Sequence, residues 1–143
     1  KLKLPDPLNQ EEKDRIIQFF DEEFKELDKT VKKHKPEVLI GTSGSFETIS
    51  KLVEVQKGRP LKKIDTAAYK LSRARIKELH DDLVFMPESK RREVKGMDMI
   101  RVDLMSIAMV FVHHIIKKFN FEKVFFSAFA LKEGLLTEAL EQE

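Results

Sequence analysis

Apolar residues recur at three- and four-residue steps along the first part of the chain. Ile16, Phe20 and Leu27 belong to this pattern, which predicts an amphipathic helix that packs on one side. Asn9 is placed to cap the helix at its start, and a proline follows the expected end near His34. The spacing therefore predicts one continuous helix.

Two short apolar runs, residues 38–40 and 124–127, are continuous rather than alternating. This is typical of strands that are buried on both faces. A helical pattern follows the first run and ends near Val55, so the order of helix, strand and helix favours an α/β architecture over a bundle. Two strands make a small sheet, so we expect further strands before Lys1. Residues 1–4 alternate between polar and apolar side chains, like the end of a strand.

The stretch from about residue 65 to residue 95 is interpreted as a helical insert that carries mostly surface charge. Residues 61–64 are expected to be extended, and Asp65 or Thr66 is expected to cap the helix that follows. After a turn, Ser89 is expected to cap a short second helix.

The longest apolar region predicts a helix over about residues 99–119. Between residues 102 and 112 only Asp103 and Ser106 are polar, and a helix that is apolar nearly all round is buried on most sides. We expect this helix to be the central packing element that covers the sheet. A last helix is predicted at residues 135–140.

The turn after the first apolar run is rich in glycine and in hydroxyl side chains. Gly41 and Gly44 lack the Cβ atoms that would keep a phosphate from the backbone, and Thr42, Ser43 and Ser45 add hydroxyl donors. The N–H groups that open the next helix point at one spot, where the helix dipole favours an anion. A capped turn without a ligand needs the same residue types, so both interpretations stay open.

Three charged residues elsewhere are candidates for the same ligand. Arg101 lies at the start of the most apolar helix, where it either anchors that helix or holds a phosphate through its fork of N–H donors. Lys132 and Glu133 follow the second apolar run, at the edge of the sheet where open α/β folds bind ligands. A surface turn is the alternative for this pair.

Other charged and histidine residues favour structural roles. Arg91 and Arg92 are interpreted as a solvated charge run rather than a phosphate site. His113 and His114 are adjacent, so they point in different directions from a helix and do not form a metal-binding pair. We expect no metal ligand and no catalytic residue in this chain.

Composition narrows the class of protein. The chain has 143 residues, of which 41% are hydrophobic and 36% are charged, which suits one domain with much solvated helix surface. With 27 basic and 25 acidic side chains interspersed, the net charge is +2, so nucleic-acid binding is disfavoured. No apolar segment is long and clean enough for a membrane span, and the absence of cysteine suits a reducing, cytoplasmic location.

Three motifs in order resemble the exopolyphosphatase and guanosine pentaphosphate phosphohydrolase family. The first is the loop from Gly41 to Ser45, and the second is Gly96 followed by Arg101-Val102-Asp103. The third is Ser127, then Leu131-Lys132-Glu133-Gly134 and two leucines. The resemblance runs from about Lys3 to Leu136, and it departs from the family's pattern at Ser45, Val102, Ala130 and Lys132.

This resemblance implies an α/β fold: part of an actin-like, ribonuclease H-like domain, in which helices pack a few-stranded sheet. Residues 1–143 would form a single truncated domain of a longer parent, with the helical insert at about residues 65–95. The missing N-terminal domain would be its partner, a homodimer is a further expected assembly, and the family's catalytic glutamate and metal-binding aspartate would lie outside this chain.

The function implied is hydrolysis of the terminal phosphoanhydride bond of polyphosphate or guanosine pentaphosphate, with Mg²⁺ as cofactor. The parent would be an enzyme, and this fragment alone would be inactive. The alternative is a non-catalytic module of the same fold that senses a nucleotide or phosphate, which the changes at Ala130 and Lys132 motivate. The residues expected to contact phosphate or nucleotide are Gly41, Thr42, Ser43, Gly44, Ser45, Arg101, Lys132 and Glu133.

Overall fold

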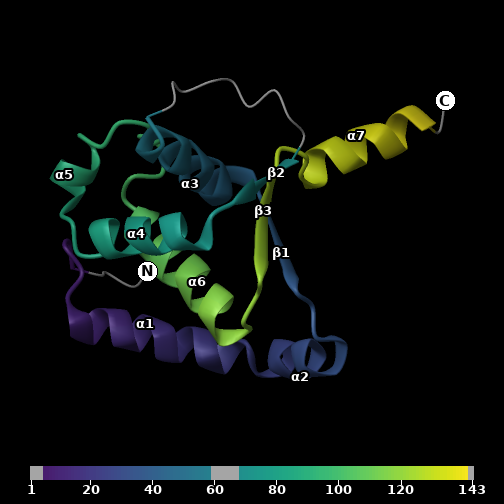
Figure 1. Cartoon of the computed structure of the whole chain (residues 1–143), viewed down its shortest axis with the longest axis horizontal. Helices are drawn as coiled ribbons and strands as arrows, with labels where there is room; N and C mark the ends of the chain where they lie inside the picture. The colour runs from purple at the N-terminus through teal and green to yellow at the C-terminus, as the bar shows by residue number, and fades with distance from the viewer. Residues whose placement is uncertain (1–4, 59–67, 142–143) are drawn as a thin grey trace.

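Helices alternate with the strands of a small mixed sheet along the chain (Figure 1). The computed structural model describes residues 5–58 and 68–141. The predictions for residues 1–4 and 61–64 lie outside the described residues. The elements are α1 (Gln10–Glu23), α2 (Lys25–His34), β1 (Val38–Thr42), α3 (Ser43–Gln56), β2 (Ala68–Leu71), α4 (Arg73–Leu83), α5 (Glu88–Arg91), α6 (Met105–Lys118), β3 (Lys123–Ser127) and α7 (Leu131–Glu141).

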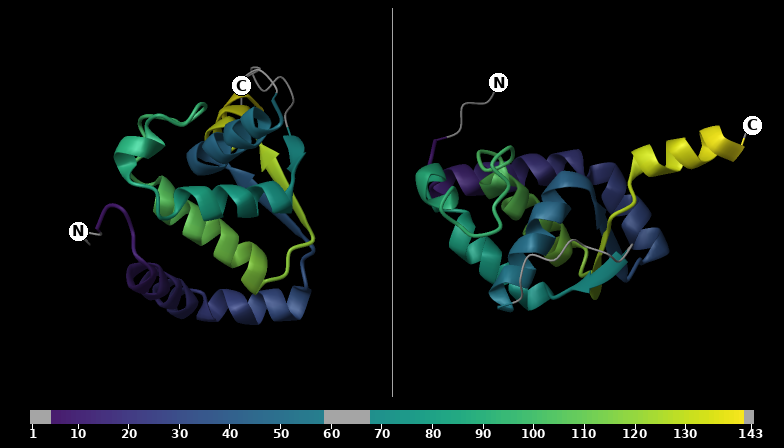
Figure 2. Two further views of the ribbon diagram at one scale, coloured as in Figure 1. Left: turned by 60° about the vertical axis from the view of Figure 1, so that its left-hand side comes forward. Right: turned by 90° about the horizontal axis from the view of Figure 1, so that it is seen from above.

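The sheet has three strands in the order β1-β3-β2. β1 runs parallel to β3, with Thr42 opposite Ser127, and β2 runs antiparallel to β3, with Leu71 opposite Val124. Helices α3, α4 and α6 lie on one side of the sheet, whereas α7 projects beyond it (Figures 1 and 2). The two predicted strands and the α/β class are therefore confirmed. The prediction that these strands are buried on both faces is wrong for β1, because Val38 is 39% exposed and Ile40 is 62% exposed.

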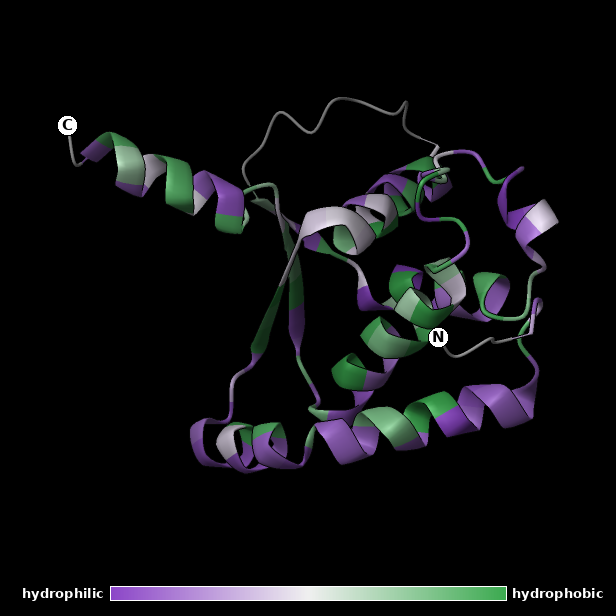
Figure 3. Ribbon diagram, turned by 180° about the vertical axis from the view of Figure 1, so that it is seen from behind, coloured by the Kyte–Doolittle hydropathy of each residue, from purple (hydrophilic) through white to green (hydrophobic). Residues whose placement is uncertain are grey.

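Helix α6 is a central packing element, as predicted, but α3 rather than α6 makes the main helix contacts with β1 and β3. Its residues Met105, Met109, Val110 and Val112 are at most 1% exposed, and it contacts both α1 and α4. Figure 3 shows apolar residues concentrated on α6 and the strands, and polar residues on α1 and α2. The helix nevertheless begins at Met105 rather than near residue 99, because the preceding residues form turns.

The prediction of one continuous N-terminal helix is wrong, because the helix breaks at Phe24. The Phe24 ring packs against Phe111 of α6 and against Phe119, with centroids 5.9 and 6.0 Å away. Lys118 pairs with Asp21 of α1 at 2.8 Å and with Asp28 of α2 at 3.3 Å. These contacts hold both helices against one end of α6, so the turn lets each of them reach it.

The predicted cap at Asp65 or Thr66 lies outside the described residues, and the helix predicted to follow it is wrong at residues 68–71. Residues 68–71 form β2, whose burial alternates and whose Tyr69 ring lies 5.5 Å from that of Phe126 in β3. Ser72 caps α4 by accepting a hydrogen bond from the Arg75 N–H at 3.4 Å. A strand with alternating burial fits the edge of the sheet better than a helix does.

The short helix α5 begins at Glu88, one residue before the predicted cap at Ser89. Arg91 at its end is 2% exposed, so the interpretation of this arginine as solvated is wrong. Its guanidinium donates to the Val102 carbonyl at 3.0 Å, to the Met86 carbonyl, and to the Asp6 carboxylate at 2.9 Å. Arg91 thus ties the N-terminal segment and α5 to the turns before α6.

Two histidine rings stack where α4 meets α6. The centroids of His80 and His113 are 4.1 Å apart, and His80 is 4% exposed. Burial lowers the pKa of His113 from the ordinary 6.5 to about 4, and burial likewise lowers the pKa of His80. Both rings are therefore neutral in the folded protein near neutral pH.

Replacing Arg91 by methionine should lower the free energy of unfolding by about 2–4 kcal/mol, since two buried carbonyl groups lose their donor. Arg92→Met is the matched control, because Arg92 is half exposed and, among the described residues, pairs only with Glu88, four residues earlier. Its expected effect is below about 1 kcal/mol. Urea unfolding followed by circular dichroism measures both, and equal losses would contradict the anchoring role of Arg91.

Stability should fall as the pH is lowered from 6.5 towards 4, because the unfolded chain takes up protons there that the folded His113 does not. We expect a loss on the order of 2 kcal/mol, less than the full shift allows, since the ring is partly solvated. His113→Phe keeps a ring at this position and should flatten the profile. His34→Phe, on an exposed residue, should leave it unchanged, and a profile unaffected by His113→Phe would count against the stacked pair.

Candidate functional site

The connection between β1 and α3 is a sharp turn at Ser43. Ser43 has φ of +64°, in the left-handed region that residues other than glycine seldom adopt. Thr42 before it is extended and its side chain makes no capping hydrogen bond to α3. The side chains of Thr42, Ser43 and Ser45 are exposed, so the predicted loop presents its hydroxyl groups to solvent.

The first N–H groups of α3 are open. An α-helix leaves its first backbone donors without partners inside the helix. Among the described residues, the N–H groups of Gly44 and Ser45 donate to no other group, whereas Ser43 follows directly on the last pair of the β1–β3 ladder, Thr42 and Ser127. The Thr48 hydroxyl donates to the Gly44 carbonyl at 3.0 Å, which fixes the first turn without covering these donors. Ser43 and Ser45 are exposed whereas Gly44 is buried, so the positive end of the helix reaches solvent at the two serines.

Each glycine of the loop makes room for one particular side chain. A Cβ on Gly41 would lie 2.0 to 2.2 Å from atoms of the Phe46 ring. A Cβ on Gly44 would lie 2.0 Å from Nε of Arg101 and 2.5 Å from its Nη2. Gly41 thus admits a core ring, whereas Gly44 admits a guanidinium group at the start of α3.

Arg101 comes from the turns before α6, and its side chain remains 36% exposed. Its Nη1 pairs with Oδ2 of Asp98, three residues earlier. A cation beside the positive end of a helix is unfavourable unless an anion accompanies it. The Asp98 carboxylate supplies one such anion, and the guanidinium and the open N–H groups together form a positively charged corner.

This corner is one end of a groove of about 740 Å³ between the edge of β1 and helix α6. The rest of the groove is mostly apolar, and no described side chain fills it. Its lining residues include the whole loop and Arg101, together with Phe20, Leu39, Ile40, Phe46, Leu104, Ile107, Ala108, Phe111, Val112 and Ile115.

Lys132 and Glu133 do not line this groove. They lie in the first turn of α7, and the Lys132 side chain is 83% exposed. One oxygen of the Glu133 carboxylate accepts the Ala130 N–H at 2.8 Å, which lowers the pKa of Glu133. Glu133 therefore acts as a cap for α7. The structure brings Arg101 to the loop but does not bring this pair into the groove.

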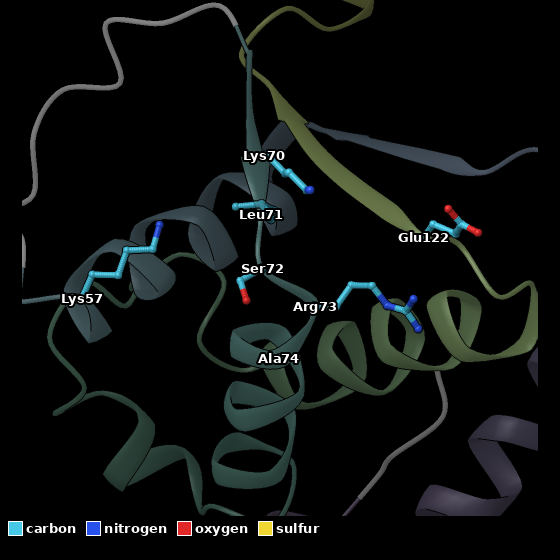
Figure 4. Close-up of a pocket in the computed structure, with 7 residues that line it drawn as sticks. All are labelled: Lys57, Lys70, Leu71, Ser72, Arg73, Ala74 and Glu122. Carbon is cyan, nitrogen blue, oxygen red and sulfur yellow. The ribbon is translucent and has the colours of Figure 1, made fainter.

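A second cavity, of about 490 Å³, lies at the opposite edge of the sheet, where β3 begins (Figure 4). Lys57, Lys70 and Arg73 line it together with Glu122. Lys57 is paired with Glu54 at 2.5 Å. Lys70 lies on β2 and the Gly41–Ser45 loop follows β1, so the central strand β3 separates this cavity from the loop.

No group of three or more metal-binding side chains occurs within residues 5–58 and 68–141. His113 stacks on His80, and His114 shares a 2.8 Å hydrogen bond with Asp21. The one residue of the charged corner that sequence reasoning missed is Asp98. Asp98 lies three residues before Arg101, a spacing at which an acidic and a basic side chain can pair. Many charged residues of this chain share that spacing, so it does not single out Asp98.

Comparison with known proteins gives one family. A family model described as the Ppx/GppA phosphatase family matches residues 4–143. Among solved structures, an exopolyphosphatase from Cytophaga hutchinsonii is 26% identical, with a TM-score of 0.90 over 99% of this chain. The Ppx/GppA family member of Aquifex aeolicus is 20% identical, with a TM-score of 0.76 over 97% of this chain. Comparison with curated proteins gave no match.

The chain spans less than half the length of these solved relatives, 45% of the first and 44% of the second. The likeness confirms the predicted fold class, part of an actin-like α/β domain. Among the described helices none is both long and apolar enough to cross a bilayer.

Alanine at the two glycines should have unequal effects. Gly41→Ala should lower the free energy of unfolding by about 1–3 kcal/mol, because its Cβ overlaps the buried Phe46 ring. Gly44→Ala should cost less than about 1 kcal/mol, since the flexible Arg101 side chain can move away. Urea unfolding of both variants measures the difference. A loss at Gly44→Ala as large as that at Gly41→Ala would mean that Arg101 is rigidly required by the fold.

Proposed function

The chain belongs to the Ppx/GppA phosphatase family, and from that premise we propose that it supplies a phosphate-binding loop to a longer phosphoanhydride hydrolase. The proposed substrate is polyphosphate or guanosine pentaphosphate, whose terminal phosphoanhydride bond is cleaved by water. This chain would contribute binding and charge stabilisation, and the carboxylate base would come from polypeptide outside it. The 143 residues alone would therefore bind substrate without turnover.

One observation carries this proposal: the Arg101 guanidinium lies over Gly44, next to the open N–H groups of α3. Phosphoryl transfer depends mainly on positioning and on electrostatic stabilisation of phosphoryl oxygens. Backbone N–H groups and a guanidinium are the donors best suited to such oxygens. The exposed hydroxyls of Thr42 and Ser45 add further donors at the same place.

Mg²⁺ remains a proposal for the parent protein. The described residues offer no group of carboxylates that could hold the ion, so none of its ligands is assigned to this chain. If bound in the parent, the ion would neutralise charge on the phosphoryl oxygens. The steps assigned to this chain, which are binding and orientation of a phosphoryl group, do not depend on it.

Helix α7 supports the idea of a further domain as partner. None of its residues is buried, and Leu131, Leu135, Leu136 and Leu140 are 55–79% exposed. Several exposed leucines on one helix are typical of an interaction site, and the helix projects from the body of the molecule (Figure 2). We propose that the part of the parent absent here covers α7. A homodimer and a cytoplasmic location stay predictions.

A non-catalytic sensor of nucleotides is the second candidate function. The apolar groove beside the loop favours it, because Leu39, Leu104 and Phe111 could accommodate a base next to the charged corner. Polyphosphate, which has no apolar part, would leave this surface unused. The two functions differ in turnover: the hydrolase releases phosphate from its substrate, whereas the sensor binds guanosine tetraphosphate and releases no phosphate.

Arg101→Met should weaken binding of tripolyphosphate to the 143-residue chain at least about 10-fold, since a charge-assisted pair is lost from the charged corner. Lys132→Met removes the same charge from exposed α7 and should change the affinity less than about 3-fold. Titration calorimetry gives both dissociation constants. In the longer parent, Arg101→Met should lower kcat/KM for phosphate release by a similar factor. Equal effects of the two substitutions would contradict the proposed loop.

A further inference from the structure

Asp98 is held in place on the turn before α6 by two separate contacts. Its Oδ1 accepts the N–H of Ile100 at 3.0 Å, and its Oδ2 pairs with Nη1 of Arg101. The side chain is 19% exposed. The N–H of Arg101 also donates to the Asp98 carbonyl at 3.0 Å, so the carboxylate and the arginine belong to one rigid turn.

The two sides of the Arg101 guanidinium have different surroundings. Nη1 pairs with the Asp98 carboxylate. Nε and Nη2 lie beside Gly44, because a Cβ added to Gly44 would overlap both atoms. Nε and Nη2 form the parallel pair of donors that binds two oxygens of one phosphate or carboxylate group. The free pair therefore faces the first turn of α3.

A guanidinium would not stay at this place without support. The start of α3 repels a positive charge, and a long, exposed arginine side chain otherwise samples many rotamers. Arg101 has no other ion pair among the described residues besides that with Asp98. The contact with Asp98 both offsets the repulsion and selects the orientation of the group.

Resting on the function proposed above, we propose that Asp98 is a positioning residue for phosphoryl recognition. It holds Nη1 of Arg101 so that Nε and Nη2 meet two oxygens of a phosphoryl group, while the N–H groups of Gly44 and Ser45 meet the same group from the other side. Asp98 does not touch the ligand. Its contribution is a guanidinium that is already oriented when the ligand arrives.

Positioning and simple electrostatics predict opposite signs. Removing a negative charge near an anion site should tighten anion binding if charge alone matters. If Asp98 orients Arg101, removing that charge should weaken binding, because the guanidinium must then be ordered at the moment of binding. Asparagine at position 98 keeps the oxygen that accepts the Ile100 N–H, so this substitution preserves the turn.

The test is titration of tripolyphosphate into the 143-residue chain and its Asp98→Asn variant. We expect the dissociation constant to rise about 5- to 20-fold in the variant. Asp103→Asn is the matched control, because the Asp103 carboxylate is exposed, accepts only the Leu104 N–H at 3.0 Å and does not pair with Arg101. Its affinity should equal that of the original chain or exceed it slightly.

A double-mutant cycle separates positioning from a general loss of structure. In the Arg101→Met background, Asp98→Asn should have no further effect on affinity. Asp98→Ser, which also offers an acceptor to Ile100, serves as a second variant if Asp98→Asn does not fold. Tighter or unchanged binding by Asp98→Asn would overturn the role of Asp98 alone. Failure of the original chain to bind tripolyphosphate would overturn the proposed function itself.

Discussion

The contact between Arg101 and Gly44 is the constraint on which the candidate site depends. Because Gly44 has no Cβ, the guanidinium can lie close to the position that this atom would occupy. Nε of Arg101 is 2.0 Å from that position and Nη2 is 2.5 Å from it. This places a cation, paired with Asp98, beside the open N–H groups of α3. Two positive groups side by side are unfavourable in the absence of an anion; Asp98 is one such anion, and the proposed phosphoryl group would be the second.

The position of Arg101 is set by the core at some distance from the site. Buried Arg91 donates to the carbonyl of Val102 at 3.0 Å, and the Val102 side chain is 1% exposed. The turn that carries Asp98 and Arg101 is thereby attached to α5 and α6. The opposite wall of the site is the loop between β1 and α3, which the parallel pairing with β3 holds. Two separately anchored segments thus meet at the charged corner, as preorganised binding requires.

The sequence predicted the elements whose pattern is strong and local. The continuous apolar runs became β1 and β3, and the nearly all-apolar segment became buried α6. The break at Phe24 and the strand β2 were missed, because tertiary contacts with Phe119 and Phe126 decide them and no local signal does. For the site, the loop and Arg101 were identified from glycine, hydroxyl and charge positions. Asp98, Arg91 as an anchor and the capping role of Glu133 depend on three-dimensional contacts that spacing does not specify.

The central claim is that the N–H groups of Gly44 and Ser45 and the guanidinium of Arg101 bind one phosphoryl group together. Proton–nitrogen correlation NMR of the ¹⁵N-labelled 143-residue chain with added tripolyphosphate tests it most directly, because each of these N–H groups gives its own signal. The account predicts that the amide signals of Gly44 and Ser45 and the Nε signal of Arg101 shift together with one dissociation constant. Shifts confined to the cavity of Lys57, Lys70 and Arg73, or no shift at all, would contradict it.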